Sequence, residues 1–229
     1  MIWLNSIKFS GSNLAKKNAL VGFSFDDGPG SHTLKVLEIL KSFGSGATFF
    51  WIVESAIKLK TEKPEVFKQI VASIKENNFE IGLHAPYDYQ PTFLSRIFGK
   101  FTGQEIEDAK VKLEELTSSF IKLYRPHYIQ LGRSVIFAHK LGLTTVFGNF
   151  IHYAEPDTPK EFQVKKFSSA KPRNILVFHD GITILRNTTN IIEVLPTVLE
   201  NLNKKGIRGT TISNVLGLKE FAAKGQNQL

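Results

Sequence analysis

Short apolar segments alternate with amphipathic segments of helical length along most of the chain. This order is typical of a parallel α/β domain, in which each strand is followed by a helix that packs on the sheet. The first strand candidate is the apolar alternation of Val21, Phe23 and Phe25. Further strands are predicted at 47–53, 79–84, 121–124, 143–150 and 175–178, and a last strand at 207–212 is expected to close the sheet.

Helices are predicted where apolar residues recur every three or four positions. The segment that follows Ser31-His32-Thr33 has this spacing and ends before Gly44. Pro64 suits the first turn of a second helix. The polar segment 152–173 contains several prolines and is predicted to be a long surface loop. The remaining helices are expected at 64–78, 104–120, 134–141 and 191–205.

Composition narrows the class of protein. The chain has 229 residues, of which 42% are hydrophobic, and this is enough for a sizeable buried core. We expect a single domain over residues 1–229 with its core at about 19–218. No apolar run is long enough for a membrane span and no signal peptide is visible, so no transmembrane segment is expected. The sequence does not predict the cellular compartment. A chain that acts on wall polymers would be secreted or wall-associated, and otherwise it would be cytoplasmic.

Charge and cysteine content limit the partners, nucleophiles and metal ligands that can be expected. The net charge of +8 comes from scattered lysines and arginines without an arginine-rich block, so nucleic acid is not an expected partner. The absence of cysteine excludes disulfides and thiolate nucleophiles. A bound metal must therefore use His, Asp or Glu. The oligomeric state is not predicted.

Polar residues follow the ends of four predicted strands: Asp26-Asp27, His84, Arg125 and His179-Asp180. In parallel α/β barrels the carboxyl ends of the strands form the active face, so these residues are expected to converge. Each has a structural alternative. The Asp pair and Asp180 can stabilise turns, His84 can be a buried hydrogen-bonded residue, and Arg125 can tie loops together.

The Asp pair and His84 suggest a metal site. Adjacent carboxylates on a regular strand point to opposite faces, but the break at Gly28-Pro29 allows the chain to turn and aim both at one site. Asp88 follows His84 by four residues and shares a face with it in a helical turn. With Asp27 they would form a site of one His and two carboxylates. Zn²⁺ is the first choice for such a site, and Mn²⁺, Co²⁺ and Fe²⁺ are alternatives.

These residues lie in motifs that resemble those of the polysaccharide deacetylases with a NodB homology domain, carbohydrate esterase family 4, over nearly the whole chain. The resemblance implies a distorted (β/α)7-type barrel. SFDDGP resembles the first motif, which implies that Asp26 is the catalytic base and Asp27 a metal ligand. HAPYD resembles the second, in which His84 is a ligand and Asp88 stands where the family usually has a second metal-binding His.

Two further motifs resemble those of the family. YRPHY implies that Arg125 orients the base and that a backbone N–H near Tyr128 helps to hold the oxyanion. ILVFHDG implies that His179 is the general acid and that Val177 and Phe178 line an acetyl pocket.

The fourth motif departs from the family, which supplies there an Asp that tunes the acid His. This chain reads FGNFIHYAEPD instead, and Glu155 or Asp157 is the expected substitute. Tyr87, Tyr89 and Phe93 follow His84 and are candidates for a rim that stacks on sugars, with inward packing as the alternative. Three other histidines are given low weight because each is expected to be exposed in a polar loop: His32, His127 and His152.

The resemblance implies a metal-dependent hydrolase that removes acetyl groups from N-acetylglucosamine glycans such as chitin, chitooligosaccharides or peptidoglycan. Its metal would acidify water, Asp26 would take the proton, and His179 would protonate the departing amine. A second hypothesis is a carbohydrate-binding or structural relative with impaired catalysis, because of Asp88 and the altered fourth motif. A third is a metal-dependent hydrolase of another amide or ester.

Overall fold

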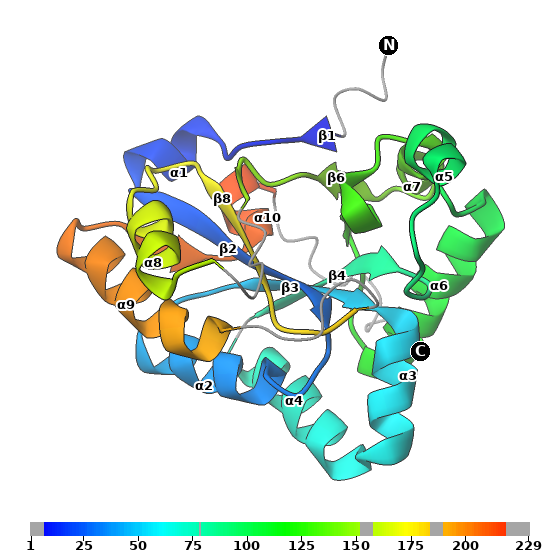
Figure 1. Ribbon diagram of the computed structural model, residues 1–229, viewed down its shortest axis with the longest axis horizontal. Coiled ribbons are helices and arrows are strands. Elements are labelled where there is room, and N and C mark those ends of the chain that lie inside the picture. Colours follow the sequence, from blue (N-terminus) through cyan, green and yellow to red (C-terminus); the bar gives the residue numbers. More distant parts are fainter. Residues whose placement is uncertain (1–6, 78, 152–157, 184–189, 219–229) are drawn as a thin grey trace, which may run out of the picture.

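The computed structural model describes residues 7–77, 79–151, 158–183 and 190–218. Its centre is a parallel sheet that is covered by helices (Figure 1). The strands are β1 (Ile7–Lys8), β2 (Leu20–Gly28), β3 (Thr48–Ile52), β4 (Glu80–Ala85), β5 (Leu123–Tyr124), β6 (Thr144–Val146), β7 (Phe150–Ile151), β8 (Ile175–His179) and β9 (Arg208–Thr210). The helices are α1 (Asn13–Lys17), α2 (Thr33–Ser42), α3 (Val53–Glu62), α4 (Pro64–Glu76), α5 (Phe93–Phe98), α6 (Gly103–Thr117), the 3₁₀ turn η2 (His127–Ile129), α7 (Arg133–Lys140), α8 (Lys160–Ser168), α9 (Ile191–Lys204) and α10 (Ile212–Leu216).

The sheet is curved into an incomplete barrel. Its strand order is β1-β6-β5-β4-β3-β2-β8-β7, and β9 pairs with the first residues of β2. Arg125 follows β5, yet its guanidinium donates a hydrogen bond to Asp26 on β2, although β4 and β3 lie between these two strands. The curvature brings the carboxyl ends of the strands together. The expected α/β fold with a distorted barrel is confirmed.

The two faces of the sheet pack differently. The convex face and the surrounding helices share the large core, where Phe25 stacks on Phe49 and on Phe178. The concave face holds a smaller apolar cluster, which α1 and α10 cover at the amino ends of the strands (Figure 1). The members of this cluster are Ala15, Phe50, Leu123, Val146, Ile175, Ile212 and Val215. The carboxyl ends on the concave side are thus left to polar residues.

Several predicted elements need correction. The strand expected at 143–150 is two strands, β6 and β7, which pair at opposite edges of the sheet. The segment 152–173, predicted as a surface loop, contains α8, whose apolar periodicity is weak because Phe167 is buried while Phe162 is exposed. The last predicted strand is shortened to β9, which pairs beside β2 without closing the sheet. Helices α1, α3 and α5 and strand β1 were not predicted.

Within the described residues, none of the helices combines the length and the apolar character that a membrane span requires.

Candidate functional site

The two adjacent carboxylates lie at a bulge that ends β2. Asp26 is in regular register with Phe50 on β3 and with His179 on β8, and the register then shifts before Gly28. Asp27 at the bulge has φ = 70°, a left-handed conformation that Asp adopts more readily than most residues. The bulge interrupts the alternation of side chains, and both carboxylates reach the concave side. This is the turn that the sequence predicted at this point.

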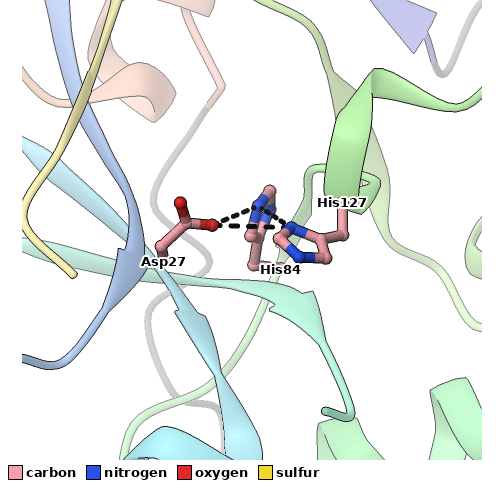
Figure 2. Close-up of side chains that lie close together, drawn as sticks. All are labelled: Asp27, His84 and His127. Carbon is pink, nitrogen blue, oxygen red and sulfur yellow. Dashed lines mark hydrogen bonds and ion pairs between the residues drawn. The ribbon is translucent and has the colours of Figure 1, made fainter. Parts of the chain in front are cut away.

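Asp27, His84 and His127 direct one atom each toward a common point (Figure 2). Asp27 Oδ1 lies 3.3 Å from His84 Nε2 and 3.5 Å from His127 Nδ1. The two imidazole nitrogens lie 2.9 Å apart. All three side chains are buried.

The outward contacts of the two histidines show which nitrogen holds its proton. Nδ1 of His84 lies 2.8 Å from the carbonyl oxygen of Arg125, so it donates there. Nε2 of His127 lies 2.9 Å from Asp88 Oδ1, so it donates to that carboxylate. In the neutral rings His84 Nε2 and His127 Nδ1 are therefore acceptors. Two imidazole lone pairs and a carboxylate oxygen then face one another, an arrangement that a proton on His84 Nε2 or a metal cation satisfies.

The spacing fits one divalent metal. Ligands about 2.1 Å from a tetrahedral ion lie about 3.4 Å from one another. The three observed separations of 3.3, 3.5 and 2.9 Å are close to this value. Two imidazoles with one carboxylate leave further coordination positions for water or substrate, as a catalytic site requires.

The local electrostatics agree with a site for a cation. Burial opposes ionisation of Asp27, but the hydrogen bond that protonated His84 donates from Nε2 and the charge of His179 outweigh burial and hold the pKa of Asp27 well below its usual value. Burial disfavours a charged His84, but the carboxylates of Asp26 and Asp27 outweigh this effect and raise its pKa. For His127, burial outweighs the hydrogen bond to Asp88 and the pKa is lowered. Negative charge is thus retained at the point where the three atoms meet.

Arg125 is fully buried beside this group and holds Asp26. Its Nη1 donates to Asp26 Oδ1 and to Ser24 Oγ, each at 2.7 Å, and its Nε donates to the carbonyl of Val146 at 3.1 Å. The guanidinium also lies 4.1 Å from the centre of the Phe50 ring. The Asp26 carboxylate is therefore charge-compensated and fixed in orientation by a residue three strands away.

The residues of β8 point to opposite faces. His179 pairs in register with Asp26, and Val177 pairs with Ser24, so both lie on the concave face. Phe178 lies on the convex face, where its ring is 4.1 Å from that of Phe167 on α8. Because side chains alternate along the strand, Phe178 packs in the core and does not share the concave face with His179, unlike Val177.

Asp88 and His127 differ most from the expectation. Asp88 is absent from the group that could hold a metal, because its Oδ1 contacts the outer nitrogen of His127. His127 is buried and belongs to the group, although it was expected to be exposed. One signal in the sequence pointed to His127: it follows Arg125 by two residues, near a predicted strand end like the other polar candidates. The strand ends before Pro126, so the alternation of side chains along it does not predict where His127 points.

The aromatic residues near His84 are placed differently from one another. Tyr89 is buried and its hydroxyl donates to Gln130, which is the inward packing left open as an alternative. Tyr87 is half-buried with its ring 5.2 Å from that of Phe101, whereas Phe93 is exposed. Tyr128 has φ = 55° and its hydroxyl lies 3.3 Å from Asp88 Oδ1.

Other candidates lie apart from the group or cannot be placed. His32 is half-buried and contacts Ser31. His152, Glu155 and Asp157 lie outside the described residues, so the expected replacement for the fourth motif has no structural account.

Asp180 forms a buried contact behind the bulge. Thr33 donates a hydrogen bond from its hydroxyl to Asp180 Oδ2, and the Thr33 oxygen accepts one from the N–H of Gly30 at 2.8 Å. Burial raises the pKa of Asp180 to about 7 against the hydrogen bond from Thr33, and the charge of Asp27 adds to the rise. The Asp180 side chain joins the end of β8 to the first residue of α2, just after the segment that follows Asp26 and Asp27.

Comparison with known proteins gives consistent results. A sequence profile described as polysaccharide deacetylase matches residues 13–146. The chain is 24% identical over 212 residues to a bifunctional xylanase/deacetylase of Pseudobutyrivibrio xylanivorans. This match covers 92% of the chain but 32% of the relative, so the chain spans about a third of the length of that curated protein.

Solved structures share the fold. The peptidoglycan N-acetylglucosamine deacetylase Bc1960 has a TM-score of 0.74 at 22% identity, with 95% of this chain and 96% of that chain covered. A family 4 carbohydrate esterase from Streptomyces lividans has a TM-score of 0.68 at 21% identity, with coverage of 86% and 94%. BA3943 of Bacillus anthracis, a family 4 pseudoenzyme, has a TM-score of 0.71 at 17% identity, with coverage of 91% and 68%.

At these identities the structural likeness shows the fold, which active enzymes and a pseudoenzyme share. The sequence profile extends further, because it covers more than half of the chain and includes the Asp pair, His84 and Arg125. On this evidence the chain belongs to the polysaccharide deacetylase family.

Proposed function

We propose that this chain is a metal-dependent deacetylase that hydrolyses the N-acetyl group of N-acetylglucosamine glycans such as chitooligosaccharides, chitin or peptidoglycan. The observation that carries the proposal is the convergence of three acceptor atoms, on Asp27, His84 and His127, beside a carboxylate held by a buried arginine. A metal site without a neighbouring base would suit a structural role. A base within the same buried group suits hydrolysis.

The metal would be held by Asp27, His84 and His127. A divalent ion bound there supplies Lewis acidity, which polarises a carbonyl and lowers the pKa of water. Zn²⁺ suits two imidazoles and one carboxylate, and Fe²⁺, Co²⁺ and Mn²⁺ are the alternatives that metal analysis distinguishes.

Asp26 acts as the base in this proposal. Arg125 binds Oδ1 of Asp26, so Oδ2 is the oxygen that accepts a proton from the attacking water. The guanidinium compensates the charge of the carboxylate and holds it in one orientation, which suits a general base in a buried site. The acceptor position is therefore set before a substrate binds.

His179 acts as the acid, because it lies in register with Asp26 on the adjacent strand and gives its proton to the departing amine nitrogen. The N–H of Tyr128 is the proposed oxyanion donor. One such donor typically lowers the barrier by about 3 kcal/mol. Val177 is the residue of β8 that remains to line the acetyl pocket, because it shares the concave face with His179.

A second candidate function is carbohydrate binding without catalysis. It is favoured by the altered fourth motif and by the similarity to a family 4 pseudoenzyme. Hydrolysis of another acetyl amide or ester is a third, and the similarity to a xylanase/deacetylase makes acetylated xylan a substrate worth testing.

The test is acetate release by the full chain from chitooligosaccharides, peptidoglycan and acetylated xylan, after loading with Zn²⁺, Co²⁺ or Mn²⁺. We expect release from the N-acetylated glycans and its loss in Asp26→Asn and His179→Ala. His139→Ala, a change on α7 outside the group, is the matched control and should retain activity. A folded, metal-loaded protein that releases no acetate but binds the same glycans would establish the second function instead.

A further inference from the structure

Asp88 follows His84 by four residues and has a carboxylate that can bind a metal, yet in the structure its Oδ1 contacts other residues. Its Oδ1 lies 2.9 Å from His127 Nε2, 2.8 Å from the N–H of Tyr89 and 3.3 Å from the Tyr128 hydroxyl. Oδ1 thus receives three donors, and Asp88 does not belong to the group whose ligand atoms lie within 4.8 Å of one another. The contact with His127 is on the far side of that ring from Asp27.

His127 has the opposite arrangement. Its Nδ1 faces Asp27 Oδ1 at 3.5 Å and His84 Nε2 at 2.9 Å. Its ring is enclosed by aromatic neighbours, with Tyr128 at 4.0 Å and Tyr89 at 5.7 Å between ring centres. The imidazole is therefore held with one nitrogen toward the group and the other toward Asp88.

We propose that Asp88 and His127 work as one unit, in which His127 Nδ1 is the third metal ligand and Asp88 is a positioning residue that holds the His127 ring from behind. The inference rests on the proposed metal site and adds which of the two residues binds the metal and which one orients the ligand. The carboxylate fixes the Nε2–H tautomer, so the lone pair of Nδ1 is directed at the metal, and it makes the ring a stronger donor.

The same geometry accounts for how the site is built from three distant segments. Asp27 comes from the bulge after β2, His84 from β4 and His127 from η2 (Figure 2). Asp88 and His127 come from two different loops, so their hydrogen bond also ties these loops together. An isolated His at the start of η2 would be free to choose between tautomers and rotamers. The carboxylate removes that choice.

Metal affinity separates the two roles. The full-length chain is stripped with a chelator, and Zn²⁺ affinity is measured by competition with a chromophoric chelator, with the visible absorption of bound Co²⁺ as a report on the ligands. Loss of a ligand, in His127→Ala, should weaken binding by more than about a hundred-fold and change the Co²⁺ spectrum. Loss of a residue behind a ligand, in Asp88→Ala, should weaken binding by about 10- to 100-fold with the spectrum largely kept.

Two further variants sharpen the distinction. Asp88→Asn keeps an oxygen that accepts from His127 Nε2 but removes the charge, so its affinity should lie between those of wild type and Asp88→Ala. In the double variant Asp88→His/His127→Ala, the longer imidazole at 88 extends into the space left by the ring of His127. This variant should recover part of the affinity that His127→Ala loses.

His139→Ala is the matched control and should bind like wild type. Circular dichroism of each stripped variant shows whether it is folded, and only folded variants are compared. If Asp88→Ala and Asp88→Asn lose at least as much affinity as His127→Ala, Asp88 is itself a ligand and the inference is wrong while the metal site stands. If folded wild type binds neither Zn²⁺ nor Co²⁺, the proposed function fails at its metal site.

Discussion

The pair formed by Arg125 and Asp26 gives the sharpest prediction about stability. Both side chains are buried, and the guanidinium makes its 2.7 Å contact with Asp26 at a point that water does not reach. Removing one partner of a buried ion pair leaves the other charge uncompensated, at a cost of about 3 to 5 kcal/mol. Arg125→Met should therefore lower the free energy of unfolding by that amount.

The size of the effect can be stated as a melting temperature. For a domain of this length, 1 kcal/mol corresponds to about 2 to 4 °C, so Arg125→Met should melt about 6 to 20 °C below wild type. Asp26→Asn should fall toward the lower end, because Arg125 keeps its hydrogen bonds to Ser24 and Val146. The double variant removes both charges and should cost clearly less than the sum of the two single changes.

The four proteins of this double-mutant cycle are wild type, the two single variants and the double variant. Their stability is measured by thermal and urea unfolding, followed by circular dichroism, with a chelator in every sample. Arg133→Met is the matched control, because Arg133 is exposed on α7 and its loss should change stability by no more than about 0.5 kcal/mol. Two single changes that add without coupling would refute the view that Arg125 compensates the charge of Asp26.

Two other predictions concern the support behind the bulge. A Cβ at Gly181 would stand 1.9 Å from the carbonyl oxygen of Asp27, so Gly181→Ala should displace the bulge and weaken Zn²⁺ binding as well as lower the melting temperature; unchanged affinity would contradict this. Asp180 has a folded pKa of about 7, above the ordinary value of 3.8, so the folded state binds its proton more tightly than the unfolded state. Its stabilising effect is complete below about pH 4 and is lost as the pH rises to about 7, because Asp180 ionises in the unfolded state over this range while the folded state still holds the proton. In chelator, Asp180→Asn should gain on the order of 3 kcal/mol in stability relative to wild type between about pH 5 and about pH 8, whereas a constant difference would contradict the buried titration.

The parallel α/β organisation was predictable because its strands and helices have strong apolar periodicity. The same applies to the convergence of Asp26, His84, Arg125 and His179, since carboxyl ends of parallel strands must meet at one edge. Weakly periodic elements were missed. The helix α8 buries few apolar side chains, and the division of 143–150 into β6 and β7 depends on which edge of the sheet each segment reaches.

The ligand set was harder to predict because it depends on the path of two loops. Spacing of four residues suggested that Asp88 shares a face with His84, but the chain does not turn helically after His84. Asp88 turns toward His127 instead, and the left-handed backbone at Tyr128 and Ile129 places the YRPHY loop against it. No sequence period encodes such backbone angles, so the partner of Asp88 became visible only in three dimensions.

The balance of buried charge at this end of the barrel favours the binding of a cation. Asp26, Asp27 and Asp180 are all buried there, and among the described residues Arg125 is the one fully buried permanent cation. Arg125 compensates Asp26, and a proton is retained on Asp180 up to a pKa of about 7. Asp27 keeps its negative charge, as its low pKa indicates, and its Oδ1 contacts His84 Nε2 and His127 Nδ1. A divalent cation that binds these three atoms in the folded protein adds to the contacts that Asp27 already makes, so metal binding should favour the folded state as well as the reaction.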